Sequence, residues 1–105
     1  MHAQIITFQL KNLSQDDYAA MCVAEAPIYT QQPGLIAKVW LASPETNTYG
    51  GMYTWRDRQS MEAYMQSDLV KSFALDPNVV GLTSRDYAVL EEPTRVTAGI
   101  LAVPA

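Results

Sequence analysis

With 105 residues, 49% of them hydrophobic, the chain has the length and composition of one small globular domain. A formal net charge of -4 without a basic stripe argues against DNA or RNA as the partner, because nucleic-acid phosphates would repel it. The longest apolar run, Leu35 to Leu41, is interrupted by Lys38 and is far shorter than the roughly 20 residues of a membrane-spanning helix, so a small molecule or another protein is the expected partner.

The first predicted elements are a strand and a helix. Ala3 to Lys11 has a β-rich composition without glycine or proline, which predicts a strand. Ser14 can cap a following helix, whose face recurs at helical spacing through Tyr18, Met21, Cys22 and Glu25. We expect this helix to end or kink near Pro27, and the run at 31–34 to form a turn.

The second half of the chain contains three further strands and a second helix. The strands are predicted at 35–41, 50–55 and 79–90, and the helix is predicted as one continuous element between a cap at Asp57 and a stop at 76–78. The order strand, helix, strand, strand, helix, strand is typical of an α+β, ferredoxin-like βαββαβ fold with both helices on one face of an antiparallel sheet. The domain is expected to span 1–93, followed by an apolar tail at 94–105.

Apolar residues occupy both faces of the predicted strands. In the second strand, Val39 and Leu41 belong to one apolar row, while Trp40 on the opposite row is also apolar. Two helices can cover only one face, so we expect a homodimer formed through the face that bears Val39, Leu41 and Met52. The tail, with Val96, Ile100, Leu101 and Val103, is expected to pack on the partner; a monomer with an apolar surface is the alternative.

The predicted hairpin brings aromatic side chains onto one face. If Asn47-Thr48 forms its tip, Trp40 lies opposite Trp55, Lys38 opposite Asp57, and Ala42 opposite Tyr53. The other face would hold Val39, Leu41, Met52 and Thr54. We expect the aromatic face to line a cavity and the aliphatic face to form the dimer interface.

Several short motifs support a family resemblance over about residues 3 to 92. They are Pro33-Gly34-Leu35, Lys38-Val39-Trp40, Gly50-Gly51-Met52-Tyr53-Thr54-Trp55 and Ser60-Met61-Glu62-Ala63-Tyr64. With the order of elements, they resemble the dimeric α+β barrel superfamily, most closely the small YdhR-like mono-oxygenases and more distantly the antibiotic biosynthesis monooxygenases. The resemblance implies a cavity between sheet and helices in each subunit. Many antibiotic biosynthesis monooxygenases carry a histidine where this chain has Tyr64, so no histidine-dependent mechanism is carried over.

Two cations and several aromatic residues are the candidates for chemistry. Lys38 can stabilise a phenolate or enolate, or can instead guard an edge strand against aggregation. Arg85 is a second candidate cation, with a structural ion pair as the alternative. Tyr64 can donate a hydrogen bond to a substrate oxygen. Trp40 and Trp55 can stack on a flat substrate, or can instead belong to the hydrophobic core. Weaker candidates for the same hydrogen-bonding role as Tyr64 are Tyr18, Tyr29 and Tyr53.

The chain has a single cysteine, Cys22, and a single histidine, His2. We therefore expect no Cys/His cluster that could bind zinc or supply a haem axial ligand. Cys22 is expected to be an ordinary buried thiol, and His2 a terminal residue, with a general base as the alternative. We therefore expect no built-in metal, flavin or haem. Residues 1–12 lack the pattern of an export signal, so a cytoplasmic location is expected.

The leading functional hypothesis is a cofactor-independent monooxygenase that uses molecular oxygen on a small aromatic quinol or polyketide-like phenol. Without a built-in redox group, the substrate itself must supply the electrons, and the protein must desolvate it and stabilise its anion. The alternatives are a cyclase or decarboxylase acting on a related aromatic, or a non-catalytic dimeric binder of small molecules. Haem degradation is disfavoured because only His2 could provide a histidine ligand.

Overall fold

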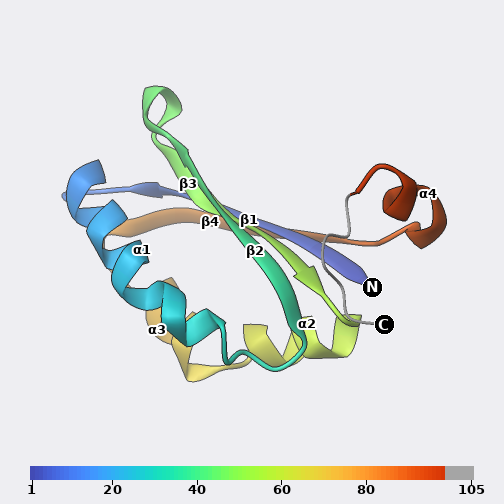
Figure 1. Ribbon diagram of the computed structural model, residues 1–105. Coiled ribbons are helices and arrows are strands. Elements are labelled where there is room, and N and C mark those ends of the chain that lie inside the picture. Colours follow the sequence, from blue (N-terminus) through green and yellow to red (C-terminus); the bar gives the residue numbers. More distant parts are fainter. Residues whose placement is uncertain (99–105) are drawn as a thin grey trace.

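The chain folds into a four-stranded antiparallel sheet with helices on one face (Figure 1). The structure is a computed structural model, and it describes residues 1–98. The spatial strand order is β2-β3-β1-β4. In chain order the elements are β1 (His2–Leu10), α1 (Gln15–Tyr29), β2 (Leu35–Ser43), the 3-10 turn η1 (Pro44–Thr46), β3 (Thr48–Trp55), α2 (Arg58–Met65), α3 (Asp68–Ala74), β4 (Val79–Ala88) and α4 (Glu91–Val96). The predicted α+β, ferredoxin-like fold is thus confirmed. None of the helices in the described range is long and apolar enough to cross a membrane.

The first predicted helix, α1, passes through Pro27 and ends at Tyr29, which fits the expected end near Pro27. Proline removes only one helical hydrogen bond there, in the last turn of a helix without buried residues, so water can satisfy the freed carbonyl. The second predicted helix is divided into α2 and α3. Ser67 breaks it, because its hydroxyl donates to the carbonyl of Tyr64 and accepts the backbone N–H of Val70, which caps a new helix.

The register of the β2–β3 hairpin also corrects the prediction. Trp40 pairs with Gly51 rather than with Trp55, which is a shift of four residues. The predicted tip at Asn47-Thr48 is wrong because η1 occupies the turn and Asn47 follows it in the left-handed region, with φ 49°. Since the shift is even, every side chain keeps its predicted face.

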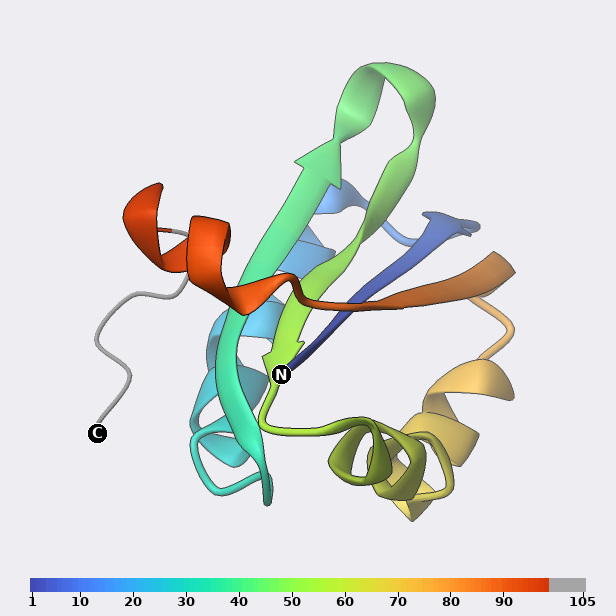
Figure 2. The same ribbon diagram turned by 90° about the vertical axis from the view of Figure 1, so that its right-hand side faces the viewer.

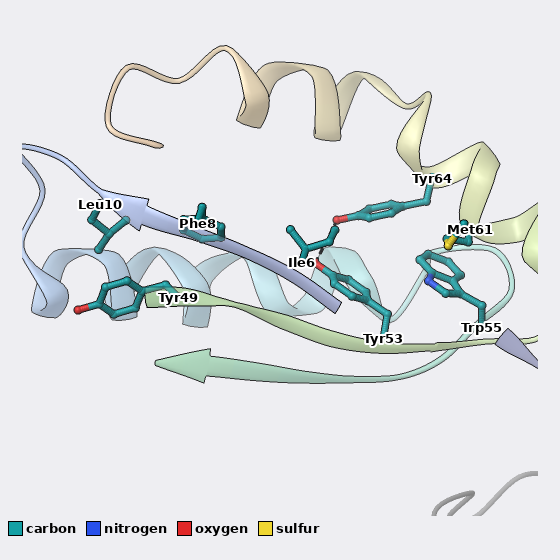
Figure 3. Packing of buried hydrophobic residues seen from close by; sticks show 8 residues of the cluster. All are labelled: Ile6, Phe8, Leu10, Tyr49, Tyr53, Trp55, Met61 and Tyr64. Atoms are coloured by element: carbon teal, nitrogen blue, oxygen red, sulfur yellow. Dashed lines mark hydrogen bonds between the residues drawn. The ribbon is translucent and has the colours of Figure 1, made fainter. Parts of the chain in front are cut away.

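The core lies on the inner face of the sheet, toward the helices. Figure 3 shows its buried residues, which are Ile6, Phe8, Leu10, Tyr49, Tyr53, Trp55, Met61 and Tyr64. At the α2 end, Trp55 donates its indole N–H to Gln4 Oε1 at 2.9 Å, and Gln4 Nε2 donates to Ser84 Oγ at 3.0 Å. The buried polar atoms of Gln4 and Trp55 therefore all have hydrogen-bond partners.

The outer face of the sheet is uncovered in the single chain. Register places Val39, Met52 and Ile5 side by side across β2, β3 and β1. Val39 is 54% exposed and Met52 is 47% exposed. An apolar row at the centre of an open sheet face is unusual for a monomer, and it matches the face that the sequence assigned to a dimer interface.

The chain leaves β4 at one end of the sheet and forms α4, which extends away from α2 and α3 (Figure 2). Val96 at the end of α4 is 84% exposed. The other apolar tail residues of the prediction, Ile100, Leu101 and Val103, lie outside the described residues. The packing of the tail on a partner therefore stays a prediction.

Candidate functional site

A cavity of about 390 Å³ lies between the inner face of the sheet and helices α1, α2 and α3. This volume falls within the range of small-molecule sites. Helix α1 buries no residue of its own and touches the sheet mainly through aromatic side chains, so it forms a wall that stands off the strands. Eight of the lining residues are grouped around the α1 side of the cavity: Tyr18, Cys22, Glu25, Tyr29, Lys38, Trp40, Tyr53 and Tyr64.

One ammonium group is set among the aromatic rings of this cavity. Lys38 Nζ lies 3.5 Å from the ring centroid of Tyr29, 3.4 Å from that of Trp40 and 4.9 Å from that of Tyr53. These are close cation–π contacts to rings on three elements, α1, β2 and β3. No carboxylate among residues 1–98 lies within ion-pair distance of Lys38.

The environment of Lys38 lowers the pKa of its ammonium group. Burial lowers the pKa of its ammonium to about 8, and the nearby Cys22 and Glu25 oppose that shift. The side chain fits here because Gly51, opposite Trp40 on β3, has none: a Cβ at that position would lie 3.1 Å from Lys38 Cε. An uncharged amine and an ammonium are therefore both available in the cavity at mildly alkaline pH.

Three phenol groups converge beside the lysine. The hydroxyl of Tyr64 lies 2.9 Å from that of Tyr29 and 3.4 Å from that of Tyr53. Figure 3 shows the Tyr53 and Tyr64 hydroxyls directed toward each other beside Ile6. Burial is the largest cause that raises the pKa of each of these phenols, so they stay protonated and act as hydrogen-bond donors rather than as bases.

The structure brings most of the predicted site residues together. Lys38, Trp40 and Tyr64 line the cavity, and the same lining includes Tyr53 and Tyr18. Tyr18 packs edge-on against the rings of Phe8 and Tyr49 at the opposite end from Tyr64.

Two predicted residues lie elsewhere. Trp55 is 0% exposed, stacks on Tyr53 and supports the cavity wall from behind without belonging to the lining. Arg85 is exposed and pairs with Ile5 in the register, which places it on the outer face of the sheet. The only cation of the predicted pair that reaches the cavity is thus Lys38.

His2 and Cys22 differ in their relation to the cavity. The His2 ring lies outside the lining, with Nε2 2.6 Å from Asp86 Oδ2. Cys22 lies in the lining, but burial raises the pKa of its thiol above the ordinary value. The thiol is therefore the dominant form at neutral pH, as expected for an ordinary half-buried cysteine.

Sequence reasoning undervalued the face of α1 that lines the cavity. Tyr29 was a weak candidate, yet it contacts both Lys38 and Tyr64, and Glu25 was not considered for the site. A signal was present in the spacing. Four residues with polar groups recur every three or four positions on this helix, and together they form one stripe: Tyr18, Cys22, Glu25 and Tyr29.

Comparison with known proteins places the chain in a structural and family context. A family model described as "Putative mono-oxygenase ydhR" matches residues 4–100. Among proteins with curated descriptions, none matches the chain.

Solved structures share the fold at low identity. A protein of unknown function from Nitrosomonas europaea, NE2512, is 14% identical with a TM-score of 0.73, covering 99% of this chain and 94% of that one. SnoaB, a cofactor-independent oxygenase from Streptomyces nogalater, is 14% identical with a TM-score of 0.66, covering 86% and 93%. The haem degrader MhuD from Mycobacterium tuberculosis, solved with two haems in its active site, is 12% identical with a TM-score of 0.68, covering 88% and 98%.

Proposed function

Because the chain belongs to the YdhR mono-oxygenase family, and thus to a family of oxidoreductases, we propose that it oxygenates a small aromatic phenol or quinol with molecular oxygen and without a resident cofactor. One observation carries the choice of substrate class. A single cavity holds an ammonium group of lowered pKa between aromatic rings and beside three phenol donors. Such a site favours a flat, apolar molecule that develops negative charge on oxygen.

The rings would bind the substrate and the polar groups would orient it. Trp40, Tyr29 and Tyr53 offer aromatic faces around Lys38, and the rest of the wall is largely aliphatic and aromatic. The Tyr64 hydroxyl, held between two other hydroxyls, can donate to a substrate oxygen without changing its own position.

The lowered pKa of Lys38 makes this residue the base that ionises the substrate. In its amine form, Lys38 accepts a proton from the substrate, and the resulting ammonium then holds the phenolate or enolate as its counter-ion. The tyrosines cannot serve as bases because burial raises their pKa values. The substrate anion transfers electrons from a ring carbon to molecular oxygen, and a bond forms between that carbon and one oxygen atom of O2. In an anthrone, the CH2 carbon and one O2 then become a carbonyl and one water, so the substrate supplies all the electrons.

Two of the three named neighbours, SnoaB and MhuD, bear on this proposal in different ways. SnoaB is described as a cofactor-independent oxygenase, which supports oxygenation without a resident cofactor on this fold. MhuD holds haem in its active site. The cavity of this chain does not fit a histidine-ligated haem, because the single histidine, His2, lies outside the lining and is bonded to Asp86.

Oxygen consumption by metal-stripped, flavin-free protein tests the function, with a panel of anthrones and hydroquinones as substrates. Their O-methylated analogues are the matched controls, since they cannot ionise at the methylated oxygen. We expect turnover only with substrates that form an anion. A requirement for added flavin or iron would overturn the cofactor-free reaction, and saturable binding without oxygen uptake would make the protein a binder.

Substitutions test the site in the same assay. Lys38→Met is expected to lower kcat by about 100-fold, the usual effect of losing one preorganised electrostatic contact. Tyr64→Phe and Trp40→Ala are expected to lower activity by smaller factors, through kcat and KM respectively. Lys71→Met, at an exposed position on α3, is the matched control. Normal turnover in the Lys38 and Tyr64 variants would overturn the site assignment.

The proposed assembly is a homodimer formed through the outer face of the sheet. The exposed row of Val39, Met52 and Ile5 supports it, since burial of this row between two sheets removes apolar surface from water. In this assembly, the tail predicted at 94–105 would pack against the partner subunit.

A further inference from the structure

We propose that Lys38 is a covalent binding site for aromatic aldehydes and ketones, which its side-chain amine captures as imines inside the cavity. This reaction uses the cavity of the proposed oxygenase but requires neither molecular oxygen nor substrate oxidation. It therefore goes beyond the proposed function and can hold or fail independently of it.

The geometry gives the amine access to a guest and few competing partners. Lys38 lies on the edge strand β2, its side chain half-buried, and it lines a cavity of about 390 Å³. The contacts recorded for its Nζ are the ring faces of Tyr29, Trp40 and Tyr53, and no ion pair holds it among residues 1–98. An amine held only by ring faces can rotate toward a carbonyl carbon without breaking a salt bridge.

The charge state of Lys38 favours attack near neutral pH. Its pKa is lowered to about 8 by burial, so about half of the amine is uncharged at pH 8, whereas an ordinary lysine of pKa 10.5 is only about 0.3% uncharged there. The groups that face it and act against this shift are Cys22 and Glu25 of α1. The three rings favour the ammonium through cation–π attraction, and a bound carbonyl compound that displaces Nζ from them removes that stabilisation.

The tyrosine cluster supplies the hydrogen-bond donors that imine formation needs. The Nζ lone pair forms a bond to the carbonyl carbon, and the carbonyl oxygen, which gains the electron pair, takes up a proton and becomes a hydroxyl. The nitrogen loses its extra proton, and its lone pair then expels the hydroxyl with another proton as water. The balance is amine plus carbonyl to imine plus water. The hydroxyls of Tyr64, Tyr29 and Tyr53 remain protonated and can stabilise the oxygen during addition and departure.

The sequence offers internal controls for this reaction. Besides Lys38, the chain has only two lysines, Lys11 and Lys71, and both are exposed. They lie outside the cavity and react with aldehydes as solvent-exposed amines. Selective reaction at Lys38 therefore reports the cavity and not the general chemistry of lysine.

The experiment uses the intact chain with 6-methoxy-2-naphthaldehyde and cyanoborohydride under nitrogen, which reduces the imine to a stable secondary amine. Peptide mapping by mass spectrometry then gives the labelling rate at each lysine of the wild-type protein. We expect Lys38 to be labelled at least about 10-fold faster than Lys11 and Lys71 at pH 8, and saturably with aldehyde concentration. The rate at Lys38 should reach half its maximum near pH 8, following its pKa.

Variants separate the cavity reaction from a merely accessible lysine. Lys38→Arg should lose the saturable label while Lys11 and Lys71 keep their slow labelling. Tyr64→Phe should slow labelling at Lys38 and leave the surface lysines unchanged. Labelling of Lys38 at or below the rate of the surface lysines, or without saturation, would overturn the proposal. Because no oxygen is present, absence of oxygenase activity leaves this result interpretable, and absence of labelling leaves the oxygenase assay unaffected.

Discussion

Two adjacent glycines on β3 decide what the inner face of the sheet can hold. Gly51 leaves room for the Lys38 chain, because a Cβ there would press on Lys38 Cε and on the Tyr53 ring. At Gly50, φ is +155°, and a Cβ would lie only 1.8 Å from the carbonyl oxygen of Ile6. Gly51 thus leaves space for the site, whereas Gly50 allows the close approach of β3 to β1.

Replacing Gly50 tests this close approach. Gly50→Ala must move the backbone of two central strands, so we expect a loss of about 3 kcal/mol or more in the free energy of unfolding. Gly81→Ala is the control. It also has positive φ, but the nearest atom is the end of the Gln9 side chain, which can rotate away. Urea unfolding of both variants should show the larger loss for Gly50→Ala, and equal losses would contradict the backbone clash.

The lowered pKa of Lys38 predicts a pH-dependent stability. Its folded-state pKa of about 8 lies below the ordinary value of 10.5, so between these values the unfolded chain holds more protons, and stability rises with pH. Lys38→Met removes this burial penalty. We expect the variant to be more stable than wild type at pH 7, with the difference shrinking as the pH rises through 8 toward 10.5.

Urea unfolding at pH 7, 8.5 and 10 measures this difference directly. Tyrosine and carboxylate titrations occur in both proteins and cancel in the comparison. Lys71→Met, at an exposed site outside the cavity, is the matched control for the loss of one lysine. A Lys38→Met difference that does not change between pH 7 and pH 10 would show that Lys38 keeps an ordinary pKa.

At the scale of elements, the cavity exists because α1 stands off the sheet. The helix buries no residue, and its aromatic residues Tyr18 and Tyr29 reach the strands while its backbone does not. Near one end, Tyr49 donates its hydroxyl to Gln15 Oε1 at 3.1 Å, and near the other, Tyr29 joins Tyr64. Side-chain contacts at both ends with space between them make α1 a cavity wall rather than a packed core helix.

The break between α2 and α3 depends on Ser67 and leads to a prediction at the scale of elements. Ser67→Ala removes the cap of α3 and the contact to the Tyr64 carbonyl, so we expect a loss of about 1 kcal/mol in the free energy of unfolding. Ser67→Thr keeps a hydroxyl and should retain most of the stability. Urea unfolding of the two variants gives the comparison, and an Ala variant as stable as the Thr variant would argue against the cap.

For the whole molecule, the two faces of the sheet have opposite character. The inner face carries the core, the cavity and the buried Gln4 network, whereas the outer face presents aliphatic side chains at its centre and Arg85 and Tyr87 on β4. Helices α1 to α3 all lie on the inner side (Figure 1), so they leave the outer face uncovered. In the proposed dimer, a second copy of the same sheet would cover this face with a matching apolar row.

A lysine in the proposed interface tests the dimer. Val39→Lys would bury an unpaired charge between two sheets, so we expect sedimentation equilibrium at micromolar concentration to show a species of 11.6 kDa instead of twice that mass. Val23→Lys, at a 77% exposed position on α1, is the matched control and should remain dimeric. A wild-type protein found only at 11.6 kDa would rule out the assembly.

Local pattern in the sequence was enough for the order of the four strands, the fold class and the face of each side chain on the hairpin, but it did not predict the break between α2 and α3 or helix α4. Strand composition, the caps at Ser14 and Asp57, and the two-residue period are properties of neighbouring residues. Even with the wrong partner for Trp40, the prediction kept it on the cavity face, because a shift of four residues preserves the alternation.

Only the tertiary structure decided which residues meet. Strand register and helix placement decided four features of the site. Helix α1 is separated from the sheet by the cavity, and Trp55 lies in the core. Arg85 lies on the outer face, and Tyr29 contacts both Lys38 and Tyr64. Such contacts join residues far apart in the chain, and their energies come from packing and desolvation that no local window contains. The sequence by itself therefore determined the faces, and the packed chain determined the site.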